Sequence, residues 1–336
     1  MNLPIETLRG LACLLLVAYH VVGADPSNGL RLEDGTLRWL NDGLAYLRMP
    51  LFTFLSGLVY GRQPFAGNSR AFLQGKARRL LVPMLVVGSL FALLQANVAG
   101  THAVLQPWYL THLKPVGHFW FVESLFWVFL LIWALECRRW LHSLWPSLAV
   151  MAAACALYLT LRGWPWLGLE GAIYLLPYFL AGMLMSRFPE HFRLDHAGVQ
   201  MSLLLVAVGG VVLMGMPVPN PDRRTVLMLL TGLALCLLCL SAGLVIPWLA
   251  RIGADSYPIY IFHVFFTAAS RIVLQRCGVE SLALLMVSGL VLGLLGPMWL
   301  ARVVSPYRWP AFLLLGKSAR RPRPRAARPA LQPVSA

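Results

Sequence analysis

Charged residues are scarce in this chain. They make up 12% of its 336 residues, whereas hydrophobic residues make up 59%, and soluble globular domains carry about 25% charged residues. This shortage of charge excludes an ordinary soluble domain. The short alternating segments of a membrane β-barrel are missing as well. The composition therefore predicts a polytopic helical membrane protein.

Metal-binding and phosphate-binding patterns are also missing. Of the six cysteines, Cys236 and Cys239 have the spacing of a redox pair, but the other two ligands of a zinc site are absent. The chain has no glycine-rich phosphate loop, and no repeat, inverted or otherwise, is visible. We therefore expect no metal, no structural disulfide and no permanently bound cofactor, with the cysteines acting as small apolar filler.

Long apolar stretches are abundant in this chain. They have, or nearly have, the ~20 residues that are needed to cross a bilayer. They lie at residues 8–24, 40–60, 80–97, 119–137, 145–161, 171–186, 199–216, 225–249, 256–276 and 281–303. The eighth is long enough to tilt. The first resembles the core of a signal peptide, but it lacks the usual basic segment before it, so we expect a retained span. The sequence predicts an all-α bundle of about ten transmembrane helices.

Basic residues are distributed unevenly around these stretches. The formal net charge is +15, and most of the lysines and arginines fall in the loops and tail on the side of the N-terminus. This bias predicts cytoplasmic N- and C-termini and argues against nucleic-acid binding. Residues 1–316 are expected to form the transmembrane domain. Residues 317–336, rich in arginine and proline, are expected to be a disordered tail against the anionic inner leaflet.

Two ionisable residues stand on the first apolar stretch. Arg9 and His20 are eleven positions apart, which on a helix places them about 20° apart in azimuth and roughly 16 Å apart along the axis. Ionisable groups inside a membrane span cost several kcal/mol and commonly mark a substrate path or a reaction site. This pair is the first indication of function.

Further motifs follow in later stretches. They are residues 48–57 (RMPLFTFLSG), 76–83 (KARRLLVP), 117–123 (GHFWFVE), 177–183 (PYFLAGM) and 253–263 (GADSYPIYIFH). Together with the Arg9–His20 pair, they resemble the acyltransferase-3 family of integral-membrane acyltransferases over about residues 5–315. The resemblance implies a ten-helix bundle in the bacterial inner membrane. It also implies acetyl-CoA as the donor from the cytoplasm and a hydroxyl of a sugar or surface polysaccharide as the acceptor, commonly for O-acetylation.

The resemblance assigns catalytic roles to the first stretch. His20 would be the general base that deprotonates the attacking hydroxyl, because imidazole titrates near neutral pH. An acyl intermediate on His20 is an open alternative. Arg9 would clamp the coenzyme A phosphates or stabilise the oxyanion; the alternative is an arginine that snorkels to the membrane boundary.

A donor site is expected at the start of the third stretch. There Lys76, Arg78 and Arg79 would add to the positive potential of a helix N-terminus and attract the coenzyme phosphates. The alternative is an ordinary positive-inside anchor. His263 is expected to shape the same site through interhelical hydrogen bonds.

The acceptor side is expected at the outer boundary. His118 and Trp120 would line the acceptor entrance; the alternative for Trp120 is the aromatic belt at the membrane interface. Arg48 lies too deep in its stretch to be a boundary residue. Glu123 is expected to form an ion pair with Arg48 or Arg9, or to orient His20. We assign no function to Arg271.

Charge alone also fits a transporter that moves an acyl group or a small solute without transferase chemistry. A non-catalytic assembly or sensor protein is a further alternative. The identity of the acceptor and the length of the acyl chain cannot be read from the sequence.

Overall fold

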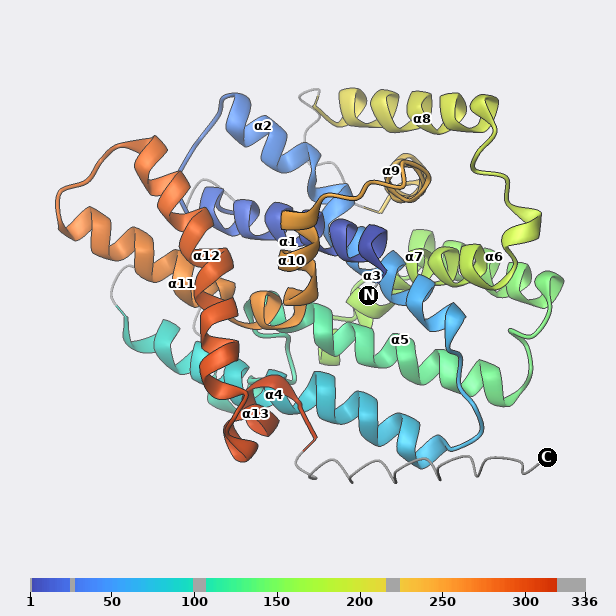
Figure 1. Ribbon diagram of the computed structural model, residues 1–336, viewed down its shortest axis with the longest axis horizontal. Helices are drawn as coiled ribbons and strands as arrows, with labels where there is room; N and C mark the ends of the chain where they lie inside the picture. Colours follow the sequence, from blue (N-terminus) through green and yellow to red (C-terminus); the bar gives the residue numbers. More distant parts are fainter. Residues whose placement is uncertain (1, 25–27, 99–106, 216–223, 319–336) are drawn as a thin grey trace, which may run out of the picture.

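The computed structural model describes residues 2–24, 28–98, 107–215 and 224–318, and these residues fold almost entirely into helices. In chain order the main helices are α1 (Leu3–Val22), α2 (Thr36–Gly43), α3 (Ala45–Arg62), α4 (Ser69–Asn97), α5 (Trp120–Cys137), α6 (Leu144–Thr160), α7 (Leu169–Arg187), α8 (Ala197–Gly215), α9 (Val226–Ser241), α10 (Pro247–Ala254), α11 (Ser256–Arg276), α12 (Leu282–Val304) and α13 (Arg308–Leu315). Short 3-10 turns precede α5 (η2, Gly117–Phe119) and α7 (η3, Trp166–Gly168). In Figure 1, α1 lies near the centre of the view, with α8 along one margin and α4 along the opposite margin.

The predicted all-α membrane bundle is confirmed. Each of the ten predicted stretches contains a helix. Within the described residues, six helices are long and apolar enough to cross a membrane: α1, α4, α5 with η2, α7 with η3, α11 and α12. Helices α6, α8 and α9 are apolar but shorter. The predicted basic tail lies outside the described residues beyond Ser318.

Two of the predicted boundaries are wrong. The third helix begins at Ser69 rather than near residue 80, because the Asn68 side chain caps it by accepting a hydrogen bond from the Ala71 N–H. The eighth stretch is not one long tilted helix. It breaks after α9 at Gly243, whose φ of 56° a helix cannot hold, and Pro247 then opens the short helix α10.

The α3–α7 crossing explains two of the sequence motifs. A Cβ added at Gly57 of α3 would lie 1.9 Å from the Phe179 carbonyl oxygen, and a Cβ added at Gly182 of α7 would lie 1.9 Å from the Phe54 carbonyl oxygen. Each glycine thus admits the backbone of the other helix. This is the close packing by small residues on which membrane helices depend.

The same arrangement joins α1 to α10. A Cβ at Gly10 would lie 1.9 Å from the Leu249 carbonyl oxygen, and one at Gly253 would lie 1.8 Å from the Glu6 carbonyl oxygen. Gly253 belongs to the motif that leads into α11. The motif therefore fixes α10 against the first half of α1. The second half of α1, which carries His20, is left to contact other parts of the chain.

A buried ion pair ties three helices together at the end of the bundle where α3, α5 and α7 meet after crossing. Glu136 of α5 is buried, and its Oε1 lies 2.6 Å from Arg187 Nη2 and accepts a hydrogen bond from the Tyr60 hydroxyl at 3.2 Å. Arg187 also donates to the Leu141 carbonyl oxygen. Glu136, Arg187 and Tyr60 therefore form one bonded polar group at this end of the bundle.

Candidate active site

A cavity of about 840 Å³ opens at the opposite end of the bundle, the end at which α1 terminates. Its walls come from the last turns of α1 and α4, from one face of α11, and from the first turns of α3, α5, α7 and α12. The predicted residues His20, Arg48, His118 and Trp120 line it, whereas Arg9, Lys76, Arg78, Arg79 and His263 do not. If the termini are cytoplasmic, as the charge bias predicts, this cavity faces the outside.

His20 packs against two other histidines. The centroid of its ring lies 4.7 Å from that of His263 and 5.8 Å from that of His118, and the His118 and His263 rings are 5.0 Å apart. The three residues come from α1, η2 and α11. The sequence motifs that contain them are therefore brought together in space.

Hydrogen bonds to carbonyl oxygens assign the proton positions on two of these rings. His263 Nδ1 lies 2.9 Å from the Ile259 and Tyr260 carbonyl oxygens, and His118 Nε2 lies 3.4 Å from the Ile261 carbonyl oxygen. Because a carbonyl oxygen only accepts, these nitrogens carry the hydrogen in the neutral rings. The remaining nitrogens, His263 Nε2 and His118 Nδ1, are therefore bare acceptors.

Both bare nitrogens are buried and have no hydrogen-bond partner among the residues that the structure describes. Unsatisfied buried acceptors are uncommon and ask for an explanation, such as an unmet ligand or a catalytic role. Here they lie beside His20 at the cavity. The bonds of His263 run within α11 and not to another helix, so the expected interhelical bonding is wrong, and the ring belongs with His20 rather than with the basic residues of α4.

A glycine places His118 in this cluster. Gly117 has φ 47°, and a Cβ there would lie 2.8 Å from the Phe91 ring. The left-handed turn that glycine permits aims the next side chain inward. Phe91 covers His118 edge-on at 5.4 Å, and the Tyr260 hydroxyl donates to the His118 carbonyl oxygen. His118 is therefore a buried wall residue rather than a residue of the outer boundary.

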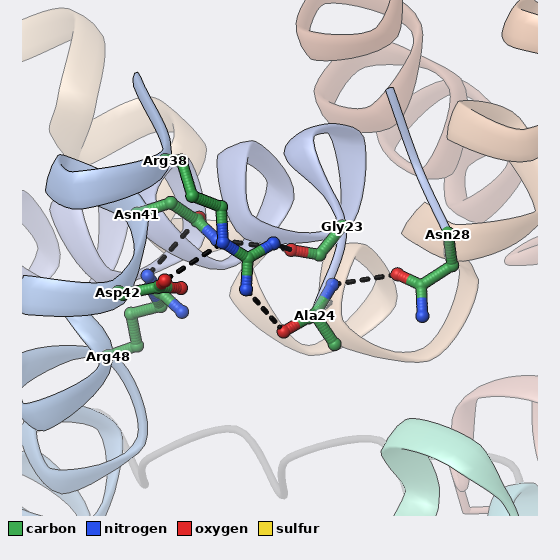
Figure 2. Close-up of polar contacts among 7 residues, drawn as sticks. All are labelled: Gly23, Ala24, Asn28, Arg38, Asn41, Asp42 and Arg48. Atoms are coloured by element: carbon green, nitrogen blue, oxygen red, sulfur yellow. Dashed lines mark hydrogen bonds and ion pairs between the residues drawn. The ribbon is translucent and has the colours of Figure 1, made fainter. Parts of the chain in front are cut away.

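Arg48 forms part of the wall next to α1. Its guanidinium carbon lies 4.2 Å from the centroid of the Tyr19 ring, and its Nη2 donates to Asn41 Oδ1 at 3.3 Å. Asn41 in turn donates to the Gly23 carbonyl oxygen, as does Arg38, which also reaches the Ala24 carbonyl oxygen (Figure 2). Side chains of α2 thus satisfy the carbonyls left at the end of α1. Helix α2 is held close to the end of α1 that carries His20.

The α5–α7 wall contains Trp120 and lies next to Glu123. Ser124 Oγ donates to the Gly168 carbonyl oxygen at 2.7 Å, and a Cβ at Gly168 would lie 3.1 Å from Glu123 Cγ. Glu123 is buried, but its carboxylate makes no ion pair or hydrogen bond within the described part of the chain. The expected ion pair with Arg48 or Arg9 is therefore not formed there.

Arg9 lies toward the other end of α1. Its Nη1 is 3.0 Å from Glu6 Oε1, one turn earlier on the same helix, and its side chain is 29% exposed. Arg9 is thus paired locally. Arg9 and His20 were predicted to share one face of their helix. They do not line one cavity, because the cavity described above reaches His20 and not Arg9.

The basic residues of α4 occupy three different environments. Lys76 Nζ lies 3.4 Å above the Phe129 ring, and Arg78 Nε donates to the Gly316 carbonyl oxygen at the end of α13. Arg79 is exposed, and its guanidinium has no partner among the described residues, although its backbone carbonyl accepts from the Tyr257 hydroxyl. Because α4 begins at Ser69, none of the three stands at a helix N-terminus, and that part of the expectation is wrong.

Several residues that line the cavity were not predicted to do so from the sequence. Tyr19, Arg224, Tyr260 and Arg271 all line the cavity. Arg271 shares one face of α11 with Val264, Thr267 and Ala268, at positions i+7, i, i+3 and i+4 of that face. This spacing relative to the His263 motif is a signal the sequence contained. Arg224 has no such signal, because it precedes its helix.

One of the comparisons with known proteins identifies the family of this chain. No curated protein and no solved structure shows significant similarity to the chain. A family profile described as an acyltransferase domain matches residues 2–302, which include every helix that lines the cavity. The match covers most of the chain, and the chain belongs to the acyltransferase-3 family of membrane acyltransferases.

Proposed function

We propose that this membrane acyltransferase transfers an acyl group, in the first instance acetyl, from acyl-CoA to a hydroxyl of a sugar or surface glycan. The acceptor enters the outer cavity, and the donor approaches from the cytoplasmic side of the inner membrane. The observation that carries the proposal is His20, which lines an outward cavity and packs against two histidines with bare, buried ring nitrogens.

In this proposal a neutral nitrogen of His20 takes the proton of the acceptor hydroxyl as its oxygen attacks the thioester carbonyl carbon. The tetrahedral intermediate then expels the thiolate, and the His20 imidazolium returns its proton to the sulfur, giving free thiol and ester. A neighbouring bare nitrogen, on His118 or His263, can accept a hydrogen bond from the His20 N–H or from the hydroxyl. That bond would hold the base or its substrate in line.

Donor binding is assigned to the end of the bundle opposite the cavity. Arg79 is the best candidate to contact the coenzyme phosphates, because its guanidinium is exposed and has no partner among the described residues. Arg9, paired with Glu6, and Lys76, placed over Phe129, are assigned supporting positions. Trp120 and Arg48 are proposed to contact the acceptor.

The transferase and transporter hypotheses differ in one measurable product. Purified protein is supplied with acetyl-CoA and a panel of glycans, and free thiol and acetyl ester are measured together. A transferase releases one thiol for each ester formed, and only when an acceptor is present. Movement of acetyl-CoA-derived label without ester formation would favour the transporter.

A further inference from the structure

The outer cavity carries positive charge on its wall. Arg48, Arg224 and Arg271 line it, and Glu170 is the one carboxylate among the described lining residues. Glu170 is already engaged, because its Oε1 lies 3.1 Å from Arg224 Nη2. Arg224 also donates to the Leu161 and Glu170 carbonyl oxygens. This pair is therefore internally satisfied.

Arg271 differs from the other two arginines. Its side chain is half-buried on the cavity face of α11, and its guanidinium forms no ion pair or hydrogen bond with any described residue. A neighbouring charge that acts on it is Arg31, a second cation. A partly buried guanidinium without an anion is costly, and an anionic ligand would remove that cost.

The position of Arg271 suits a ligand that also reaches His20. It lies eight residues beyond His263 on α11, roughly 12 Å along the axis, toward the opening of the cavity. The residues between them on this face are small or short, Thr267 and Ala268. A volume of about 840 Å³ holds a ligand well above the size of one small sugar.

We infer that the acceptor is an acidic oligosaccharide, which presents a carboxylate or phosphate group to Arg271 while a hydroxyl of another part of the molecule meets His20. The inference rests on the proposed function, because it takes the outer cavity as the acceptor site. Arginine suits either group, since its planar fork binds both carboxylate and phosphate with two parallel hydrogen bonds.

Matched disaccharides test the inference. Binding of cellobiose is compared with that of cellobiouronic acid, and binding of trehalose with that of trehalose 6-phosphate, by calorimetry on the purified full chain. We expect at least one acidic sugar to bind about tenfold or more tightly than its neutral counterpart, and the preference to shrink as salt rises. The uronic acid and phosphate arms separate the two sources of charge.

Two variants of α11 locate the effect. Arg271→Gln should reduce the acidic-to-neutral affinity ratio to within about twofold of unity, and Arg271→Lys should restore part of it. Arg276→Gln is the matched control, because Arg276 is exposed on the same helix and does not line the cavity. Equal binding of acidic and neutral sugars, no binding of either acidic sugar, or a ratio that Arg271→Gln leaves unchanged would overturn the inference.

Thiol release with the same sugars separates this inference from the proposed function. Charge-dependent binding through Arg271 without thiol release would leave the anionic site standing and remove the transferase mechanism. Thiol release with acidic and neutral sugars alike would support the transferase mechanism and overturn the anionic site.

Discussion

The two ends of this bundle hold different kinds of polar group. At the closed end, Glu136 is bonded to Arg187 and Tyr60, and α10 packs tightly on the first half of α1. At the open end, His118 and His263 each keep a bare nitrogen beside His20. Helices α1 and α5 therefore take part in close packing or ion pairing at one end and line the cavity at the other.

On the proposed function, this contrast separates the residues that hold the fold together from those that act on the substrates. The Glu136–Arg187 pair at the closed end stabilises the fold, whereas the bare nitrogens of His118 and His263 are expected to gain a partner when a ligand binds. Changes at the closed end should therefore affect stability, and changes at the open end should affect rate or binding. The following substitutions test that division, from the largest expected effect to the smallest.

The largest effect is expected at the α3–α7 crossing. Gly182→Ala would place a methyl carbon 1.9 Å from the Phe54 carbonyl oxygen, a backbone atom that cannot move aside without separating the helices. We expect little or no monodisperse protein by size-exclusion chromatography. Gly75→Ala is the control, because a Cβ at Gly75 of α4 has nothing within 4 Å. Equal yields of both variants would refute close backbone packing at this crossing.

The buried ion pair at the closed end should come next. Glu136→Gln leaves Arg187 without its carboxylate, and removal of one partner of a buried pair costs about 3–5 kcal/mol. We expect a clear fall in the unfolding temperature in detergent. Glu190→Gln, at an exposed carboxylate that meets only His191 among the described residues, should change it little. A fall of the same size in both variants would argue against a stabilising role of the Glu136–Arg187 pair.

A smaller effect is expected for the donor. Arg79→Ala should weaken acetyl-CoA binding about tenfold, which corresponds to about 1.4 kcal/mol, because its exposed guanidinium is proposed to meet phosphate. Arg70→Ala, at an exposed arginine earlier on α4, is the control. Unchanged affinity in Arg79→Ala would reduce this cluster to a marker of topology.

The smallest effect concerns pH and the loop before η2. Burial lowers the pKa of His112 below its usual value of 6.5, against an opposing hydrogen bond to the Leu85 backbone, and its Nε2 lies 2.9 Å from Ser89 Oγ. The folded state thus binds the proton less well than the unfolded state. The stability that His112 contributes is present above pH 6.5 and is lost as the pH falls below that value.

This pH effect is measured as the change in unfolding temperature between pH 7.5 and pH 5.5. The fall should be smaller in His112→Gln than in the unmodified protein. His196→Gln, at an exposed histidine before α8, should leave the fall unchanged. An identical fall in His112→Gln would show that His112 is not the titrating group.

The sequence predicted the helices better than the contacts between them. Apolar length identified ten helices, and the Asn68 cap and the break at Gly243 were missed because local turn chemistry shifts boundaries without changing composition. His20 was identified because an ionisable residue in an apolar stretch can be recognised from the sequence alone. The union of His20, His118 and His263 could not be found, since it depends on how three helices pack.

Arg9 and Arg271 show the same limit of prediction from helical spacing: one was given a role at the cavity that it does not line, and the other lines the cavity but was given none. Helical spacing placed Arg9 on the same face as His20, yet the cavity stops short of it because α10 packs against that half of α1. Arg271 received no role, yet the face of α11 that it shares with Thr267 borders the cavity. Periodicity predicts which residues share a face, but the neighbouring helices decide what that face meets.

The most direct test is the single-turnover rate of acyl transfer in His20→Gln, measured as thiol release with saturating acetyl-CoA and acceptor. Loss of a general base should lower that rate by about 10²–10⁴-fold. The unfolding temperature and the acceptor affinity should stay close to those of the unmodified protein. A His20→Gln variant that folds normally and transfers at the full rate would contradict the account.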